Sequence, residues 1–229
     1  MTAFVHYSGY KCCMAGSTIA KLGTIAAGRW GMVTTAQAAE VGVSRKTLSS
    51  LTASGALERL AQGVYRMAGT PAAMLEIDTI RVHWLALGGT ASLVAAGRSA
   101  AALHEIGDWF PGASEFVATT RRTTRIDGVR TRIRSLEAED TVFVDGMPSM
   151  TVERTIADLV ESWEDLSLVS DAVAQAVQRG ILLRPTRLRE LLDPLAQRSR
   201  EPSGAALLER LSRASPSQVA RHQESAEST

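Results

Sequence analysis

The chain has few cysteines, few aromatic residues and no long apolar run. Its 229 residues include two cysteines, which are adjacent at Cys12 and Cys13. Neighbouring cysteines rarely bridge and no third cysteine is present, which argues against a disulfide-stapled secreted domain and a cysteine metal site. The longest weakly polar run, residues 84–97, is shorter than the roughly 18 residues of a membrane-spanning helix. The first residues lack the features of a signal peptide. We therefore expect a cytoplasmic protein with no membrane segment, metal or cofactor.

Common catalytic motifs are also missing. The chain has no Gly-x4-Gly-Lys phosphate loop, no His-Glu-x2-His metal motif and no Gly-x-Ser-x-Gly nucleophile. The catalytic loop and metal-binding triplet of protein kinases are absent too. His104, Glu105 and Asp108 would share one helical turn, but a single histidine in such a helix more often has a structural role. No catalytic residue is therefore assigned, although an atypical nucleotide-dependent transferase stays open.

Basic and acidic residues are nearly equal in number over the whole chain, but they are distributed unevenly along it. The net charge is +1, from 25 basic and 24 acidic residues. Residues 17–70 carry six basic and two acidic residues, a net charge of +4. Residues 71–229 carry 18 basic and 22 acidic residues, a net charge of −4. A basic segment on a mildly acidic body is typical of a module that neutralises phosphates locally.

Residues 34–66 have the pattern of two short helices followed by a hairpin. Thr34 or Thr35 is a suitable N-cap for the first helix, and Gly42 supports the sharp turn after it. Ser44 caps the second helix, which Gly55 ends. Two strand-like runs, joined at residues 61–63, then form a hairpin. With a further helix predicted over residues 17–30, this is the element order of a winged helix-turn-helix.

The second helix of this pattern has the features of a DNA recognition helix. Leu48 and Leu51 form its apolar stripe, and basic and hydroxyl side chains occupy the opposite face. Side chains at the start of a recognition helix reach base edges and phosphates. The predicted DNA contacts are Arg45, Lys46, Ser49 and Ser50 on the helix, with Arg59, Gln62 and Arg66 on the hairpin. The alternative is a winged helix used only for protein contacts.

A second, mixed α/β domain is predicted from Pro71, because proline is disfavoured after a helical residue and tolerated in a first helical turn. The Gly88-Gly89 pair should end its first helix, and a small-residue helix should follow and end near Gly107. The later elements predicted are a hairpin around residues 126–129, a strand pair over 142–150 with an Asp-Gly turn, a helix capped by Thr151, a helix over 166–179 and a helix from Thr186.

An arginine-rich ladder distinguishes the hairpin predicted over residues 115–134. By the period of two, Val129, Thr131 and Ile133 would point to one face of the strand and three arginines to the other. Like charges facing each other are destabilising, so the ladder suggests contact with a DNA backbone or an acidic protein. Internal pairing with Glu137, Glu139 and Asp140 is the alternative. This second basic face comprises Arg121, Arg122, Arg125, Arg130, Arg132 and Arg134.

Three stretches together resemble the AbiEi-type antitoxins of type IV (abortive infection) toxin-antitoxin systems. They are TTAQAAEVGVSRKTLSSLTASGALERLAQGVYR, SLVAAGRSAAALHEIGDW and DGMPSMTVERTIADLVE, within residues 24–195. The resemblance implies an N-terminal winged helix that binds repeats in its own promoter. It also implies a C-terminal domain that counters a nucleotidyltransferase-like toxin encoded alongside. DNA contacts map onto the helix from Ser44 and the wing around Gln62, and a basic face maps onto the arginines at 121–134.

These observations predict an α+β protein with an N-terminal winged helix-turn-helix followed by a mixed α/β antitoxin domain. The expected segments are a disordered extension at 1–16, the winged domain at 17–70, the antitoxin domain at 71–195 and a polar tail at 196–229. The expected function is neutralisation of a cognate toxin and repression of its own operon, in phage defence, by a monomer or weak dimer. The alternatives are an enzyme that modifies the partner, for example by phosphorylation, and a stand-alone winged-helix regulator.

Overall fold

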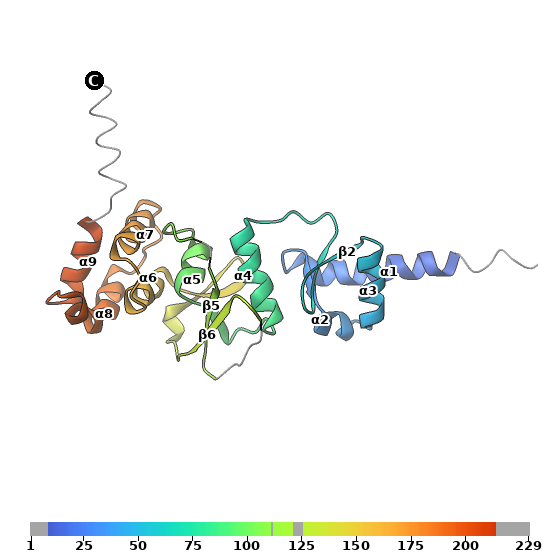
Figure 1. The fold of residues 1–229 in the computed structure, drawn as a ribbon, viewed down its shortest axis with the longest axis horizontal. Helices are drawn as coiled ribbons and strands as arrows, with labels where there is room; N and C mark the ends of the chain where they lie inside the picture. The colour runs from blue at the N-terminus through green and yellow to red at the C-terminus, as the bar shows by residue number, and fades with distance from the viewer. Residues whose placement is uncertain (1–8, 111, 121–125, 214–229) are drawn as a thin grey trace, which may run out of the picture. The chain divides into compact units, whose positions relative to one another are not determined.

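The fold comprises two compact units, Met1–Thr90 and Ala91–Thr229. The computed structural model describes residues 9–110, 112–120 and 126–213 (Figure 1). Mixed helices and sheets make it an α+β protein, as predicted. The division after Thr90 lies further along the chain than the boundary predicted at Pro71.

The N-terminal unit has the element order of a winged helix-turn-helix, which confirms that prediction. Its three strands form an antiparallel sheet in the order β1-β3-β2. The elements are α1 (Gly9–Ala27), β1 (Met32–Thr34), α2 (Thr35–Glu40), α3 (Arg45–Ala53), β2 (Leu57–Ala61), β3 (Val64–Met67) and α4 (Leu75–Ala86). Because α1 begins at Gly9, residues 9–16 of the predicted extension are helical; residues 1–8 lie outside the described residues.

A small apolar core fixes α3 in this unit. Leu48 and Leu51 of α3 are buried together with Leu22 of α1, Ala38 of α2 and Leu57 of β2. Since the apolar stripe of α3 is occupied by this core, its opposite face is left to solvent.

Helix α4 packs on the winged module, which explains the later boundary. The rings of Trp30 and Trp84 meet edge to face with centroids 6.2 Å apart. The guanidinium of Arg81 lies 4.8 Å from the centre of the Trp30 ring, and that of Arg29 lies 5.8 Å from the centre of the Trp84 ring. These cation-π contacts bind α4 to the segment that precedes β1. Pro71 therefore begins a connection within the unit.

The C-terminal unit combines a five-stranded sheet, ordered β6-β5-β4-β8-β7, with a helical bundle (Figure 1). Its strands are β4 (Leu93–Ala95), β5 (Ser114–Ala118), β6 (Val129–Ile133), β7 (Thr141–Val144) and β8 (Met147–Met150). Its helices are α5 (Gly97–His104), α6 (Val152–Glu161), α7 (Leu166–Gln178), α8 (Pro185–Ala196) and α9 (Gly204–Arg213), with short 3-10 turns η1 (Ala138–Asp140) and η2 (Gln197–Ser199).

Locally determined elements of this unit follow the predictions. The β7-β8 hairpin turns at Asp145 and Gly146, both with positive φ, of 46° and 79°. Thr151 caps α6 by accepting a hydrogen bond from Arg154 N at 3.3 Å. Helices α7 and α8 lie within about a residue of their predicted starts.

Two predictions about the sheet were wrong. Strand β6 pairs in parallel with β5, with Ser114 opposite Val129, and does not form a hairpin with it. The Asp127-Gly128 turn is present and directly precedes β6, but it does not join β6 to β5 as a hairpin turn would. Residues 93–95, which were expected to be helical, form the central strand β4. The prediction failed because the periodicity of a short, fully buried apolar run does not distinguish a strand from a helix.

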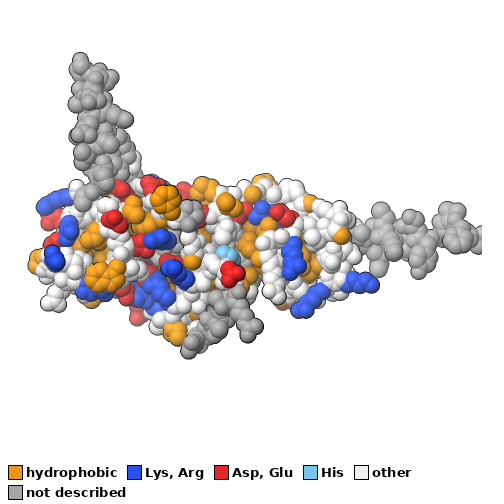
Figure 2. All heavy atoms as spheres, viewed as in Figure 1, with side chains coloured by type: hydrophobic (Ala, Val, Ile, Leu, Met, Phe, Trp, Pro, Cys, Tyr) orange, Lys and Arg blue, Asp and Glu red, His pale blue; other side chains and the backbone are white. Residues whose placement is uncertain are grey.

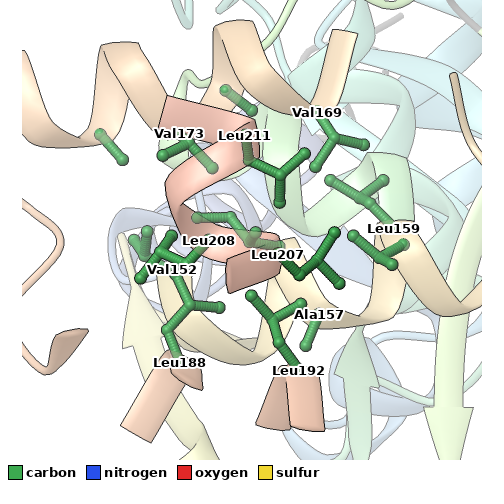
Figure 3. Close-up of a cluster of buried hydrophobic side chains, with 14 of the residues drawn as sticks. Val152, Ala157, Leu159, Val169, Val173, Leu188, Leu192, Leu207, Leu208 and Leu211 are labelled. Carbon is green, nitrogen blue, oxygen red and sulfur yellow. The ribbon is translucent and has the colours of Figure 1, made fainter. Parts of the chain in front are cut away.

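The largest buried cluster of the described residues lies among the helices (Figure 3). Side chains from α6, α7, α8 and α9 meet there; those drawn and named are Val152, Ala157, Leu159, Val169, Val173, Leu188, Leu192, Leu207, Leu208 and Leu211. Three of these leucines come from α9. Residues 204–213 of the predicted polar tail therefore form an integral helix of the unit, and residues 214–229 lie outside the described residues.

We expect His104 to make the stability of the C-terminal unit depend on pH. Its Nε2 lies 2.7 Å from the Met150 carbonyl oxygen, and burial lowers the pKa of the ring below its ordinary value of 6.5. The folded unit therefore binds fewer protons than the unfolded chain at low pH. The contribution of the neutral His104 ring to stability is complete above pH 6.5 and declines as the pH falls below that value. One such group gives a slope of at most about 1.4 kcal/mol per pH unit.

The variant His104→Gln should have a flatter dependence of unfolding free energy on pH between 7 and 5, measured by chemical denaturation. The glutamine amide retains a donor for Met150 without titrating. Since burial also lowers the pKa of His83 in the other unit, the difference between variant and wild type is the readout. Equal slopes would contradict the assignment.

Candidate nucleic-acid interface

Helix α3 presents the predicted contact face to solvent. Ser44 Oγ accepts a hydrogen bond from Thr47 N at 3.1 Å, which caps the helix. Gly42, at φ 78°, makes the tight turn from α2 in a conformation that favours glycine. Arg45 and Lys46 open the helix, are exposed and form no ion pair with any described residue. Ser49 and Ser50 are also exposed, one turn further on. The sequence therefore places two cations at the N-terminal turn of the helix that no described carboxylate compensates.

The wing is joined to the start of α2. Thr35 N donates a hydrogen bond to Gly63 O at 2.9 Å, at the turn between β2 and β3. The turn residues are Gln62, which is exposed, and Gly63, whose φ is 78°. Arg59 of β2 is exposed as well. Figure 2 shows exposed basic side chains on this unit, whereas acidic and basic side chains are interspersed on the C-terminal unit.

Arg66 has a structural role that removes it from the predicted contact set. Its Nη2 lies 2.6 Å from Asp78 Oδ2 on α4, and the two side chains are only 11% and 10% exposed. Arg81 Nη1 approaches the other oxygen of Asp78 at 3.6 Å. One carboxylate thus compensates two largely buried guanidinium groups, and Arg66 joins the wing to α4 in place of facing a phosphate.

Replacement of Asp78 by alanine should destabilise the N-terminal unit by about 3 kcal/mol, because it removes the carboxylate that two largely buried cations share. The measurement is denaturant unfolding followed by tryptophan fluorescence, since Arg81 lies over the Trp30 ring, which in turn meets Trp84. Glu76→Ala, on the same helix, is the control and should cost about 0.5 kcal/mol or less. An Asp78 variant as stable as that control would show that the ion pair is dispensable.

Two of the three described arginines of the second basic face are held by internal ion pairs. Arg121, Arg122 and Arg125 lie outside the described residues. Arg132 and Arg134 of the ladder bind acidic groups of α6, which corrects their assignment to an external surface. Arg130 remains accessible: its side chain is 76% exposed and 3.9 Å from Glu115.

The acidic centre of this network is Asp158, whose side chain is fully buried. Asp158 Oδ2 accepts hydrogen bonds from Arg132 Nη2 at 2.5 Å and from Gly97 N at 3.0 Å, and Oδ1 accepts one from Arg134 at 3.2 Å. Gly97 has a φ of 52°, and a Cβ there would lie 2.0 Å from Glu115 Oε2. Close packing of carboxylates against the start of α5 therefore requires glycine at this position.

Glu161 extends the network by one helical turn. It binds Arg134 and, at 2.9 Å, Arg154. Burial alone would raise the pKa of Glu161, but the two arginines outweigh burial and hold the pKa below its ordinary value. Internal pairing was the alternative interpretation of the ladder, although with other partners: Glu139 and Asp140 bind Arg184 and Arg187 instead.

Other kinds of site receive little support from the described residues. No group of His, Cys, Asp and Glu among them could hold a metal ion. No described helix is long and apolar enough to cross a membrane. His104 contacts a backbone carbonyl and Glu105 pairs with Arg179, so His104 serves the fold at that turn.

Comparison with known proteins bears on the N-terminal unit. Residues 22–68 match the family described as "Transcriptional regulator, AbiEi antitoxin". This segment is similar to the AbiEi antitoxins. The match confirms the resemblance over this segment, which includes α2, α3 and the wing. The exposed residues of α3 therefore lie within the part of the chain that is similar to a family of transcriptional regulators.

The comparison with solved structures gives a weak likeness over most of the chain. No curated protein matches the chain. The crystal structure of the RV2827C protein from Mycobacterium tuberculosis is similar over 84% of this chain and 81% of that chain, with 22% sequence identity and a TM-score of 0.43.

One feature of the C-terminal unit escaped the sequence interpretation. A pocket lies beside Trp163, between the ends of α6 and α8. Its arginines are Arg198 and Arg200, in the segment QRSRE, and Arg210 of α9; all three lie in the stretch predicted as a polar tail. The sequence signal was the presence of Trp163 and Arg200 directly after helical segments, where glycine is usual.

Proposed function

We propose that this protein is an antitoxin that represses its own operon by binding repeats in promoter DNA and neutralises a cognate nucleotidyltransferase-like toxin. It would do so in the cytoplasm, as a monomer or weak dimer, in phage defence. The observation that carries the DNA-binding part is the pair Arg45 and Lys46, exposed and without ion-pair partners among the described residues at the start of α3.

The geometry of the winged unit supports a specific mode of contact. A recognition helix enters the major groove with its N-terminal residues at the base edges. Arg45 and Lys46 would lead, and Ser49 and Ser50 would follow along the groove. Arg59 and Gln62 on the wing would meet the backbone beside it, where cations release counterions and fix the register. Arg130 is the described arginine of the second basic face that is free enough to add a phosphate contact.

The two activities are proposed to reside in different units. The N-terminal unit carries the basic helix, whereas the C-terminal unit is mildly acidic overall and most of its described arginines pair internally. A change confined to α3 should therefore affect repression without affecting neutralisation.

A promoter fusion and a growth assay test this division together. The variant carrying Arg45→Ala and Lys46→Ala should relieve repression of a reporter driven by the upstream DNA, yet still rescue growth of cells that express the toxin. Arg189→Ala, an exposed arginine of α8 with no ion-pair partner among the described residues, is the control and should retain both activities. Loss of both activities together would contradict the proposal.

A further inference from the structure

A half-open pocket of about 260 Å³ lies on the C-terminal unit, at the end of α6 that carries Glu161. Val160 of α6, Leu166 of α7 and Leu195 of α8 contribute its apolar side chains. Trp163, Arg198 and Arg200 also line it. The pocket therefore combines an apolar lining with a cationic rim.

Two residues at the pocket adopt a backbone conformation that normally requires glycine. Trp163 has a φ of 60° and Arg200 a φ of 61°. A bulky residue in the left-handed region is a strained outlier, and such strain gathers at functional sites. The side chain of Trp163 is, in addition, 73% exposed. Glycine at these two positions would relieve the backbone strain, and at position 163 it would also remove an exposed indole.

Two of the three arginines that line the pocket carry a charge that no described carboxylate neutralises; the third, Arg210, pairs with Glu201 at 3.2 Å. The guanidinium of Arg198 lies 4.3 Å from the centre of the Trp163 ring and donates to the carbonyl oxygen of Glu161 at 3.3 Å. Neither Arg198 nor Arg200 pairs with a carboxylate among the described residues. The nearest acidic lining residue, Glu164, is already held by Arg98 through two hydrogen bonds of 2.9 and 2.8 Å.

We propose that this pocket binds an acidic segment of a partner protein. An aliphatic or aromatic side chain of that segment enters between Trp163 and the apolar lining, and flanking carboxylates pair with Arg198 and Arg200. Tryptophan and arginine are the residues most enriched among interface hot spots. Small-molecule sites are usually more enclosed, with volumes of roughly 300–1,000 Å³, so a protein side chain fits this shallow site better.

The identity of the partner rests on the proposed function, which makes it the cognate toxin. The chemistry of the site does not rest on the proposed function, because it follows from the apolar lining and from the guanidinium groups of Arg198 and Arg200 on the rim. Two probes separate these claims. One is the purified toxin, and the other is the synthetic peptide acetyl-Glu-Asp-Leu-Glu-Asp-amide, which carries one apolar side chain between carboxylates.

Binding of both probes to the full chain is measured by calorimetry for the toxin and by tryptophan fluorescence for the peptide. The double variant Arg198→Glu with Arg200→Glu should lower both affinities at least tenfold. Arg189→Glu is the matched charge reversal outside the pocket and should leave them unchanged. Trp163→Phe should abolish the fluorescence response to the peptide. The neutral variant Arg198→Gln with Arg200→Gln replaces the reversal if the latter fails to fold, as judged by circular dichroism.

The outcomes are distinct. Peptide binding that depends on the two arginines, with no binding of the toxin by the wild type, supports the pocket and overturns the proposed partner. Affinities that survive the arginine replacements overturn the pocket as the docking site. Absence of peptide binding together with arginine-dependent binding of ATP overturns a protein segment as the occupant, as does absence of any arginine-dependent binding.

Discussion

Replacing Arg45 and Lys46 with alanine is expected to lower the affinity for promoter DNA at least about 30-fold, since removing one base or phosphate interaction costs roughly 1–3 kcal/mol. Both side chains are exposed at the N-terminal turn of α3 and have no ion-pair partner among the described residues. Their removal should therefore weaken DNA binding and leave folding unchanged. The slope of log affinity against log salt should also decrease by about one for each phosphate interaction that is removed.

Fluorescence anisotropy with labelled upstream DNA measures this effect, and thermal unfolding verifies that the variant is folded. Arg189→Ala is the control for loss of an exposed guanidinium. A double variant that binds as tightly as the wild type, with the same salt slope, would mean that α3 does not face the nucleic acid.

Replacing Asp158 with alanine should destabilise the C-terminal unit by about 3–5 kcal/mol, the cost of removing one partner from a buried ion pair. Asp158 is fully buried and compensates two arginines while accepting the Gly97 amide. Its removal leaves Arg132 and Arg134 with less counter-charge and an amide without an acceptor. The sheet edge at β6 and the start of α5 should therefore loosen together.

Chemical denaturation monitored by circular dichroism tests this expectation. Asp108→Ala removes an exposed carboxylate of the same unit and should change stability by about 0.5 kcal/mol or less. An Asp158 variant as stable as the Asp108 variant would show that the network is incidental to the fold.

The winged unit was predictable because its signals are local. A capping Ser44, a glycine at each turn and the spacing of Leu48 and Leu51 each specify a few neighbouring residues, and together they determine two helices and the turn between them. The exposed face of α3 follows directly from the buried stripe. The family match over residues 22–68 falls on this same segment.

The C-terminal sheet was less predictable because its pairings are distant. The two-residue alternation of side chains in β6 is the same whether the strand pairs antiparallel or parallel with β5. The direction of pairing depends on the connection between the strands, which lies outside this local pattern. Likewise, Arg132 looked like a surface cation until the fold placed Asp158, 26 residues away, against it. Arg66 illustrates the same limit, since its partner Asp78 lies in a helix that had been assigned to the next domain.

We propose that the winged unit recognises the promoter of its own operon. The direct test is fluorescence anisotropy of the intact protein on the DNA upstream of its gene across a salt series, with scrambled DNA of the same composition as the comparison. We expect tighter binding to the upstream DNA than to the scrambled DNA at every salt concentration, with the affinity for both DNAs falling as salt rises. Equal affinity for the upstream and scrambled DNA would contradict it and would indicate that α3 and the wing contact protein.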